Sequence, residues 1–146
     1  MKNKYPTSIE FESLLGFWLI SALMIIRGVT VILTPEQSIE RSSLYTTMND
    51  ITPFFIWGII FIVGAIIILV STVSQTRRKY IGLIVGNFLG VLVGFPFAII
   101  AFLESHMMIT QITITLIAFF NLVLAIHSGV AIWREKRRIH MLRKQT

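Results

Sequence analysis

Cysteine is absent from the 146-residue chain. This absence excludes disulfide bonds, cysteine-ligated zinc and thiol chemistry. Charged residues are sparse as well, at 14% of the chain, and only seven of them are acidic. The long apolar stretches contain no paired carboxylates, no serine–histidine–acid set and no phosphate-binding loop. We therefore expect a non-enzymatic protein that holds no metal and no cofactor.

Hydrophobic residues make up 55% of the chain and are gathered into long blocks between short charged stretches. A helix needs about 20 mostly apolar residues to cross a bilayer core of about 30 Å. Because the blocks leave little chain for a soluble domain, we predict an all-α, integral membrane four-helix bundle that forms a single domain over residues 1–146. The four blocks that meet the length requirement are 13–33, 53–73, 80–103 and 111–133.

The connection between the first two blocks carries helix signals of its own. The letters TPEQ, which begin at Thr34, place a threonine at the N-cap and a proline at the first helical position. They predict a short surface helix over about 35–46 on the outer side of the membrane. Leu44 and Met48 are expected near the membrane boundary. The second span is expected to begin in the same way, with Thr52 as its cap.

The basic residues predict the orientation of the chain. With four spans, the N-terminus, the loop at 74–79 and the tail at 134–146 lie on one side. Cytoplasmic loops carry the excess of lysine and arginine, and only Arg41 lies in the opposite loops. We therefore predict a multi-pass protein of the cytoplasmic (inner) membrane with both termini in the cytoplasm. The basic residues on the predicted inner side are Lys2, Lys4, Arg77, Arg78, Lys79, Arg134, Lys136, Arg137, Arg138, Arg143 and Lys144.

The net charge of +6 does not indicate a nucleic-acid partner. Its excess lies in one short loop and the tail, where the topology alone accounts for it. The predicted partner of these residues is the bilayer, because each basic side chain near an anionic surface contributes about 1 kcal/mol of binding. The residues that would contact lipid headgroups are Arg77, Arg78, Lys79, Arg134, Lys136, Arg137 and Arg138.

Glycine recurs at every fourth position of the third block. Helices in lipid associate where small residues let their backbones approach closely. The face formed by these glycines and Ala98 drifts by about 40° at each four-residue step around the helix. Its partner is either a neighbouring span of the same chain or a second copy in a ring or pore. This glycine face, which is predicted to pack against another helix, consists of Gly82, Gly86, Gly90, Gly94 and Ala98.

Asn87 lies beside this glycine face, and the fourth block offers a second face of small residues. Asn121, Ala125 and Gly129 repeat there at four-residue spacing. We predict that spans three and four pack tightly. A buried amide between them would hydrogen-bond a neighbouring helix, which stabilises association by about 1 kcal/mol.

Arg27 is the charged residue that falls well inside a predicted span. An arginine at mid-bilayer costs about 2.5–3.5 kcal/mol on insertion scales. It can extend outward to water, pair with Glu104, Asp50 or Glu36, or attract an anion. In the third block, Pro96 removes one backbone hydrogen bond and predicts a kink, which serves either as a bend or as a gate.

The layout resembles the small four-span membrane proteins of Gram-positive bacteria and their phages. The resemblance is carried by IRGV from Ile26, WG at Trp57, the RRK turn at 77–79 and the basic tail. Some such proteins are holins, which assemble in the cytoplasmic membrane and permeabilise it. The long outer loop and Arg27 differ from a simple holin. Our leading hypothesis is a protein that acts through helix association, such as a holin-like or other pore-forming oligomer. The alternatives are an accessory, immunity or regulatory subunit of a larger membrane complex and a small anion transporter.

Overall fold

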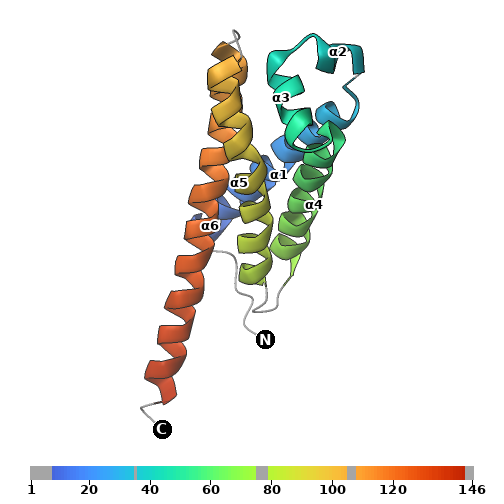
Figure 1. Ribbon diagram of the computed structural model, residues 1–146. Coiled ribbons are helices and arrows are strands. Elements are labelled where there is room, and N and C mark those ends of the chain that lie inside the picture. Colours follow the sequence, from blue (N-terminus) through green and yellow to red (C-terminus); the bar gives the residue numbers. More distant parts are fainter. Residues whose placement is uncertain (1–7, 35, 75–78, 105–107, 144–146) are drawn as a thin grey trace.

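The computed structural model describes residues 8–34, 36–74, 79–104 and 108–143 (Figure 1). Side chains within this range are not described at 8–13, 39, 104, 135, 136, 138–140, 142 and 143. Six helices account for nearly all of the described residues, and no strand occurs among them. The helices are α1 (Ser8–Ile32), α2 (Glu36–Glu40), α3 (Ser43–Ile51), α4 (Phe54–Val73), α5 (Lys79–Glu104) and α6 (Met108–Arg143).

Four of these helices are long and apolar enough to cross a membrane. The prediction of an all-helical, multi-pass membrane layout is therefore confirmed. The largest difference in the apolar stretches is at the fourth span, which begins earlier than the predicted residue 111. The apolar stretches are Leu14–Ile32, Phe54–Val73, Lys79–Leu103 and Met108–Arg134.

The helices α4, α5 and α6 lie side by side, with α5 in the middle (Figure 1). Helix α1 crosses one face of this layer. It passes α6 near Gly16, where a Cβ would lie 3.8 Å from a methyl carbon of Leu124, and then packs along α4. Helices α2 and α3 cover the end of the bundle at which α1 ends and α4 begins (Figure 1). At the opposite end α6 extends well beyond the other helices.

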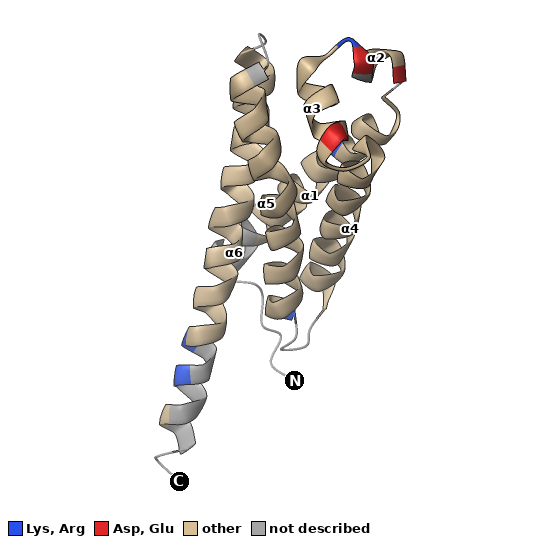
Figure 2. Cartoon of the chain, in the orientation of Figure 1, with Lys and Arg blue, Asp and Glu red and all other residues tan. Residues whose placement is uncertain are grey.

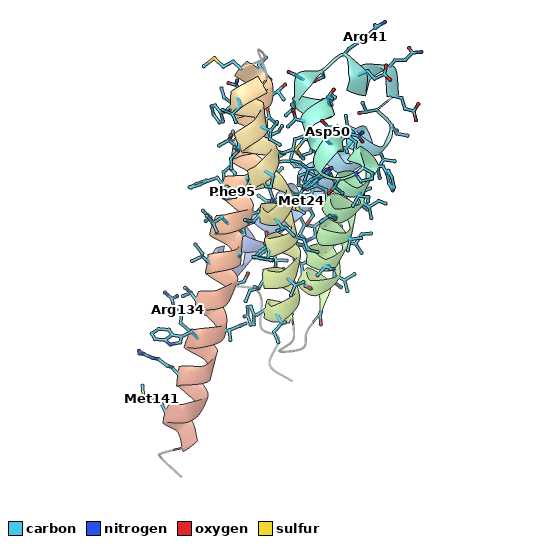
Figure 3. All side chains as sticks on the ribbon, in the orientation of Figure 1. Met24, Arg41, Asp50, Phe95, Arg134 and Met141 are labelled. Carbon is cyan, nitrogen blue, oxygen red and sulfur yellow. The ribbon has the colours of Figure 1, made fainter. Side chains whose placement is uncertain are left out.

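Apolar side chains fill the interior and also cover the outer surface. Phe61, Ile68 and Phe97 are fully enclosed, whereas Val73 and Leu103 are 72% and 78% exposed. Figure 3 shows side chains extending outward along the whole bundle. Such a surface suits hydrocarbon, where no hydrophobic force separates inside from outside and close packing joins the helices. The buried polar side chains among the described residues are Ser21, Ser71, Asn87, Asn121 and Ser128.

The segment between α1 and α4 differs from its prediction. Two helices replace the single helix expected over 35–46, and the second continues to Ile51. They are separated at Ser42, whose backbone is extended with φ −116° and ψ 114°. Leu44 and Met48 are buried rather than placed at the membrane boundary. Helix α3 packs on α4 and α5, so tertiary contacts with the bundle decide the position of its apolar face.

The start of α4 is held by two side chains. The Phe54 N–H donates to the Oδ1 atom of Asn49 at 2.9 Å. The prediction of Thr52 as the cap is wrong, because its hydroxyl donates to the carbonyl of Ile51 at 2.8 Å. The indole N–H of Trp57 reaches the carbonyl oxygens of Met48 at 3.2 Å and Thr52 at 3.1 Å. These bonds fasten the end of α3 to the first turn of α4.

Candidate functional site

Glycines bring α1 and α4 into backbone contact. A Cβ placed on Gly28 would lie 2.7 Å from the carbonyl oxygen of Gly58, and a Cβ on Gly58 would lie 2.6 Å from that of Gly28. No larger side chain fits either position while the helices keep this spacing. Sequence reasoning missed both residues, because neither belongs to a regular repeat in its own span.

A second glycine pair joins α4 to α5. A Cβ on Gly86 would lie 2.7 Å from the carbonyl oxygen of Gly64, and the reverse distance is 3.0 Å. One turn earlier on α5, Gly82 faces the hydroxyl group of Ser71. The first half of the predicted glycine face is therefore covered by α4.

The second half of the same glycine face is covered by α6. A Cβ on Gly90 would lie 2.5 Å from the Oδ1 atom of Asn121, and a Cβ on Gly94 would lie 3.0 Å from the Cβ of Ala118. Ala98 is also buried. Since each four-residue step rotates the face by about 40°, one run of glycines serves two neighbours in succession. The whole face is filled within one chain.

The second predicted face of small residues makes less contact. Of its three members, Asn121 meets Gly90, Ala125 is partly buried, and a Cβ on Gly129 would have no atom within 4 Å among the described residues. Helix α6 separates from α5 toward its C-terminal end (Figure 1), which leaves Gly129 open.

The two asparagines are fully buried but bond their own helices. The amide of Asn87 donates to the carbonyl of Leu83 at 2.7 Å, and that of Asn121 donates to Ile117 at 2.8 Å. Each Oδ1 atom is buried without a hydrogen-bond partner in the part of the chain that the structure describes. The expected hydrogen bond between helices is therefore not formed. A carbonyl four residues back on the same helix lies within easy reach of such a side chain.

Arg27 lies between α1 and α5, beside the close contact at Gly28. Its Cζ atom is 5.4 Å from the centre of the Phe97 ring, which is a cation–π distance. The Nε and Nη2 atoms are buried and have no hydrogen-bond partner among the described residues. Two of the three guanidinium nitrogens are thus enclosed by protein, so these atoms do not extend outward to water.

Within the described structure, neither Glu36 nor Asp50 accepts a hydrogen bond from the buried Nε and Nη2 atoms of Arg27. Glu36 and Asp50 are exposed at the covered end of the bundle. Figure 3 shows Asp50 in this region. The side chain of Glu104 lies outside the described residues. Its pairing with Arg27 stays a prediction.

An aromatic cluster surrounds the ring beneath Arg27. The ring centre of Phe97 lies 6.0 Å from that of Phe54 and 6.5 Å from that of Trp57. The ring of Tyr45 in α3 is tilted by 43° against that of Phe54, with 4.8 Å between the ring centres. Sequence reasoning missed this cluster, because its members come from three helices and share no spacing. The available signal was that the end of the third span and the start of the second lie at the same membrane edge.

A cavity of about 390 Å³ lies between the ends of α1 and α3, the helix α2 and the start of α4, and Phe54 is one of the residues that line it. One part of its wall is apolar and the other is acidic. Figure 2 shows the described acidic residues gathered at this end of the molecule. The lining residues are Val31, Ile32, Thr34, Glu36, Glu40, Asn49, Phe54 and Phe55.

Pro96 is partly buried inside α5, directly before Phe97. The helix continues from Lys79 to Glu104 on both sides of it. Because proline has no N–H, the carbonyl of Leu92 loses its helical donor. The roles of bend and gate stay predictions.

Two of the predicted headgroup residues lie over aromatic rings at the basic end. The Nζ atom of Lys79 is 5.0 Å from the Tyr80 ring centre, and the Cζ atom of Arg137 is 3.7 Å from that of Trp133. Arg134 is exposed on the extended part of α6 (Figure 3). Aromatic rings and basic side chains of this kind are typical of a membrane–water interface. Arg77 and Arg78 lie outside the described residues, as do the side chains of Lys136 and Arg138.

No family model, no curated protein and no solved structure matches the chain. Among the described residues, no group of histidine, aspartate and glutamate side chains is arranged to hold a metal ion. The strongest candidate site is therefore Arg27 with its aromatic surroundings, where two guanidinium nitrogens are buried without a hydrogen-bond partner among the described residues.

Proposed function

We propose that the chain is a multi-pass membrane protein that binds an anionic group at Arg27, between α1 and α5. The observation that supports this is the enclosure of Nε and Nη2 without an acceptor among the described residues. A guanidinium group presents its N–H donors in a fixed fork that matches a carboxylate or a phosphate. An oxyanion would supply both the missing acceptors and the missing charge.

The Phe97 ring alone does not balance the buried charge. A cation over an aromatic ring gains about 0.5–2 kcal/mol, whereas an arginine inside the bilayer costs about 2.5–3.5 kcal/mol even on the lower scales. An intramembrane ionisable group is by default a functional candidate. The anion-transporter hypothesis is the form of this proposal in which the bound oxyanion crosses the membrane.

Titration of the purified full-length protein in detergent with inorganic phosphate and with acetate tests the proposal. We expect at least one oxyanion to bind saturably, with an affinity at least tenfold lower for Arg27→Gln. Arg27→Lys keeps the charge but loses the fork, so its affinity should fall between the two. Arg41→Gln is the matched control, because Arg41 is exposed at the same end of the molecule. Equal binding by the wild type and Arg27→Gln would refute the proposal, and uptake into proteoliposomes separates transport from binding alone.

We also propose the inner-membrane orientation, with the end covered by α2 and α3 outside and the extended end of α6 in the cytoplasm. Lys79, Arg134 and Arg137 lie at the second end, and the described acidic side chains lie at the first (Figure 2). This distribution agrees with the excess of positive charge on cytoplasmic loops. Single cysteines introduced at Ser38 and Met141 should react from opposite sides of sealed cells. Reaction of both from one side would refute the orientation.

A second candidate function, association with another membrane protein or a second copy, has a different basis. The glycine face is filled by α4 and α6, so a pore or a complex would have to use another surface. Helix α6 is the least covered span, with 22% of its apolar stretch buried against 44% for α4 and α5. Its outer face carries Phe119, Val123, Ile126 and Val130, all exposed.

Oxidative cross-linking in the membrane tests association through α6. Val123→Cys should form dimers, or adducts with one partner, more readily than Ile59→Cys, which is equally exposed on α4. Equal cross-linking at both positions would count against a specific α6 interface. For the holin-like form, expression should collapse the membrane potential, and a steady potential at high expression would exclude a pore.

A further inference from the structure

The cavity at the covered end of the bundle is a site separate from Arg27, which does not line it. Its volume of about 390 Å³ suits a small organic molecule. Three helices supply most of its lining: α1 contributes Val31 and Ile32, α4 contributes Phe54 and Phe55, and α2 contributes Glu36 and Glu40. The remaining lining residues are Thr34, just after α1, and Asn49 of α3.

The polar part of the wall consists mainly of hydrogen-bond acceptors. The Thr34 hydroxyl gives its proton to the carbonyl of Thr30 at 2.8 Å, so only its lone pairs are left for a ligand. Asn49 uses its Oδ1 atom to accept the Phe54 N–H, so its amide N–H₂ group is the donor in this wall. The carboxylates of Glu36 and Glu40 accept only, and one helical turn separates them on α2. Neither forms an ion pair within the described part of the chain.

The apolar part of the wall is aromatic and aliphatic. Val31 and Phe54 are buried, and the Phe54 ring is held by Tyr45 at 4.8 Å between ring centres. Phe55 is 52% exposed and borders the opening. A bare metal ion would leave this surface unfilled, and a neutral apolar molecule would leave both carboxylates without a cation.

We propose that this cavity binds an organic ammonium ion carried on a short apolar body. The ammonium group lies between Glu36 and Glu40, where it relieves the repulsion between their charges. The apolar body packs against Ile32, Phe54 and Phe55, and the aromatic faces also favour a cation near them. Since the cavity is at the end of the spans, the same chemistry is available from a free amine and from the amine headgroup of a lipid.

Calorimetric titration of the full-length protein in detergent with hexylammonium tests this inference, with hexanol and hexanoate as matched probes. We expect hexylammonium to bind saturably and at least tenfold more tightly than either. The double variant Glu36→Gln, Glu40→Gln should weaken hexylammonium at least tenfold, and Phe55→Ala should weaken it several-fold. Asp50→Asn should leave it unchanged, because Asp50 is exposed and does not line the cavity.

Three results would overturn the inference. They are the absence of saturation with hexylammonium, equal affinity for hexanol, and unchanged affinity in the double variant. All four side chains to be changed are on the surface or at the opening, so helix content and melting temperature should match the wild type and binding can be compared directly. Nanodiscs identify the source of the amine. If a lipid headgroup with ammonium N–H donors is the occupant, phosphatidylethanolamine raises the apparent Kd of hexylammonium relative to phosphatidylcholine, which has the same net charge but no ammonium N–H. If a free amine is the occupant, the Kd is the same in both.

Discussion

The two halves of α5 contact their neighbours in opposite ways. From Gly82 to Gly94, glycines press directly against α4 and then α6, and no charge is present. Beyond Pro96, the large ring of Phe97 is buried, and the cation of Arg27 lies over it. The close glycine contacts between the helices leave no room for a charged side chain, whereas the ring of Phe97 offers a cation–π contact to one. The close helix contacts and the buried cation thus lie at different ends of the same helix.

The largest effect is expected where the backbones are closest. Gly86→Leu places side-chain atoms against the Gly64 carbonyl, which is backbone and cannot rotate away. Overpacking usually costs about 1–3 kcal/mol, and we expect this variant to exceed that range and to lose the folded state. Gly129→Leu is the control, because no atom of the described residues lies within 4 Å of its Cβ position. Similar melting temperatures for the two variants, measured in the same detergent, would contradict the described contact.

Substitution of Arg27, in contrast, should stabilise the folded state. Arg27→Met removes an enclosed cation and keeps much of its apolar length, so the free energy of unfolding should rise by about 2–3 kcal/mol. The measurement is reversible unfolding in mixed micelles without added oxyanion. Arg41→Met, at an exposed position, should change stability little. A destabilised Arg27→Met protein would mean that the guanidinium already has a counter-charge in the chain.

A smaller effect is expected at the attachment of α3. Trp57→Phe removes the single indole N–H that is shared between the carbonyl oxygens of Met48 and Thr52, an interaction that contributes about 1 kcal/mol. Amide hydrogen exchange should accelerate in α3 and stay unchanged in α6. Trp18→Phe serves as the control, since Trp18 is exposed. Uniform exchange in both helices of the Trp57 variant would argue against a local attachment.

The smallest effect concerns the two buried asparagines. Because Asn87 and Asn121 bond their own helices, a double-mutant cycle to alanine should give a coupling energy below about 0.5 kcal/mol. Coupling of 1 kcal/mol or more would instead indicate a direct bond between α5 and α6.

The helical layout was predictable because bilayer thickness fixes the length of an apolar span, and four stretches of the sequence meet it. The glycine run of α5 was visible through its period. Its division between α4 and α6 was not, because that depends on which helices lie on either side. Gly28, Gly58 and Gly64 show no period, and only the fold brings them into contact.

The candidate site was predictable only in its central residue. Arg27 stands out as a charge in an apolar stretch, but Tyr45, Phe54, Trp57 and Phe97 come together through tertiary structure alone. The segment before α4 was placed at the membrane boundary because Leu44 and Met48 suit a surface helix. In the structure Leu44 and Met48 are buried, because α3 packs onto the apolar surfaces of α4 and α5.

The central claim is that α4 and α6 of the same chain cover the glycine face of α5. The part of α5 beyond Pro96 instead contacts the cation of Arg27 through the ring of Phe97. Because the sequence has no cysteine, the double variant Gly94→Cys, Ala118→Cys tests this directly. A Cβ on Gly94 would lie 3.0 Å from the Cβ of Ala118, close to the separation of about 3.5–4.5 Å in a disulfide. Oxidation in the membrane, followed by gel electrophoresis, should give a monomer with an internal disulfide. Disulfide-linked dimers at the expense of that monomer would contradict the account.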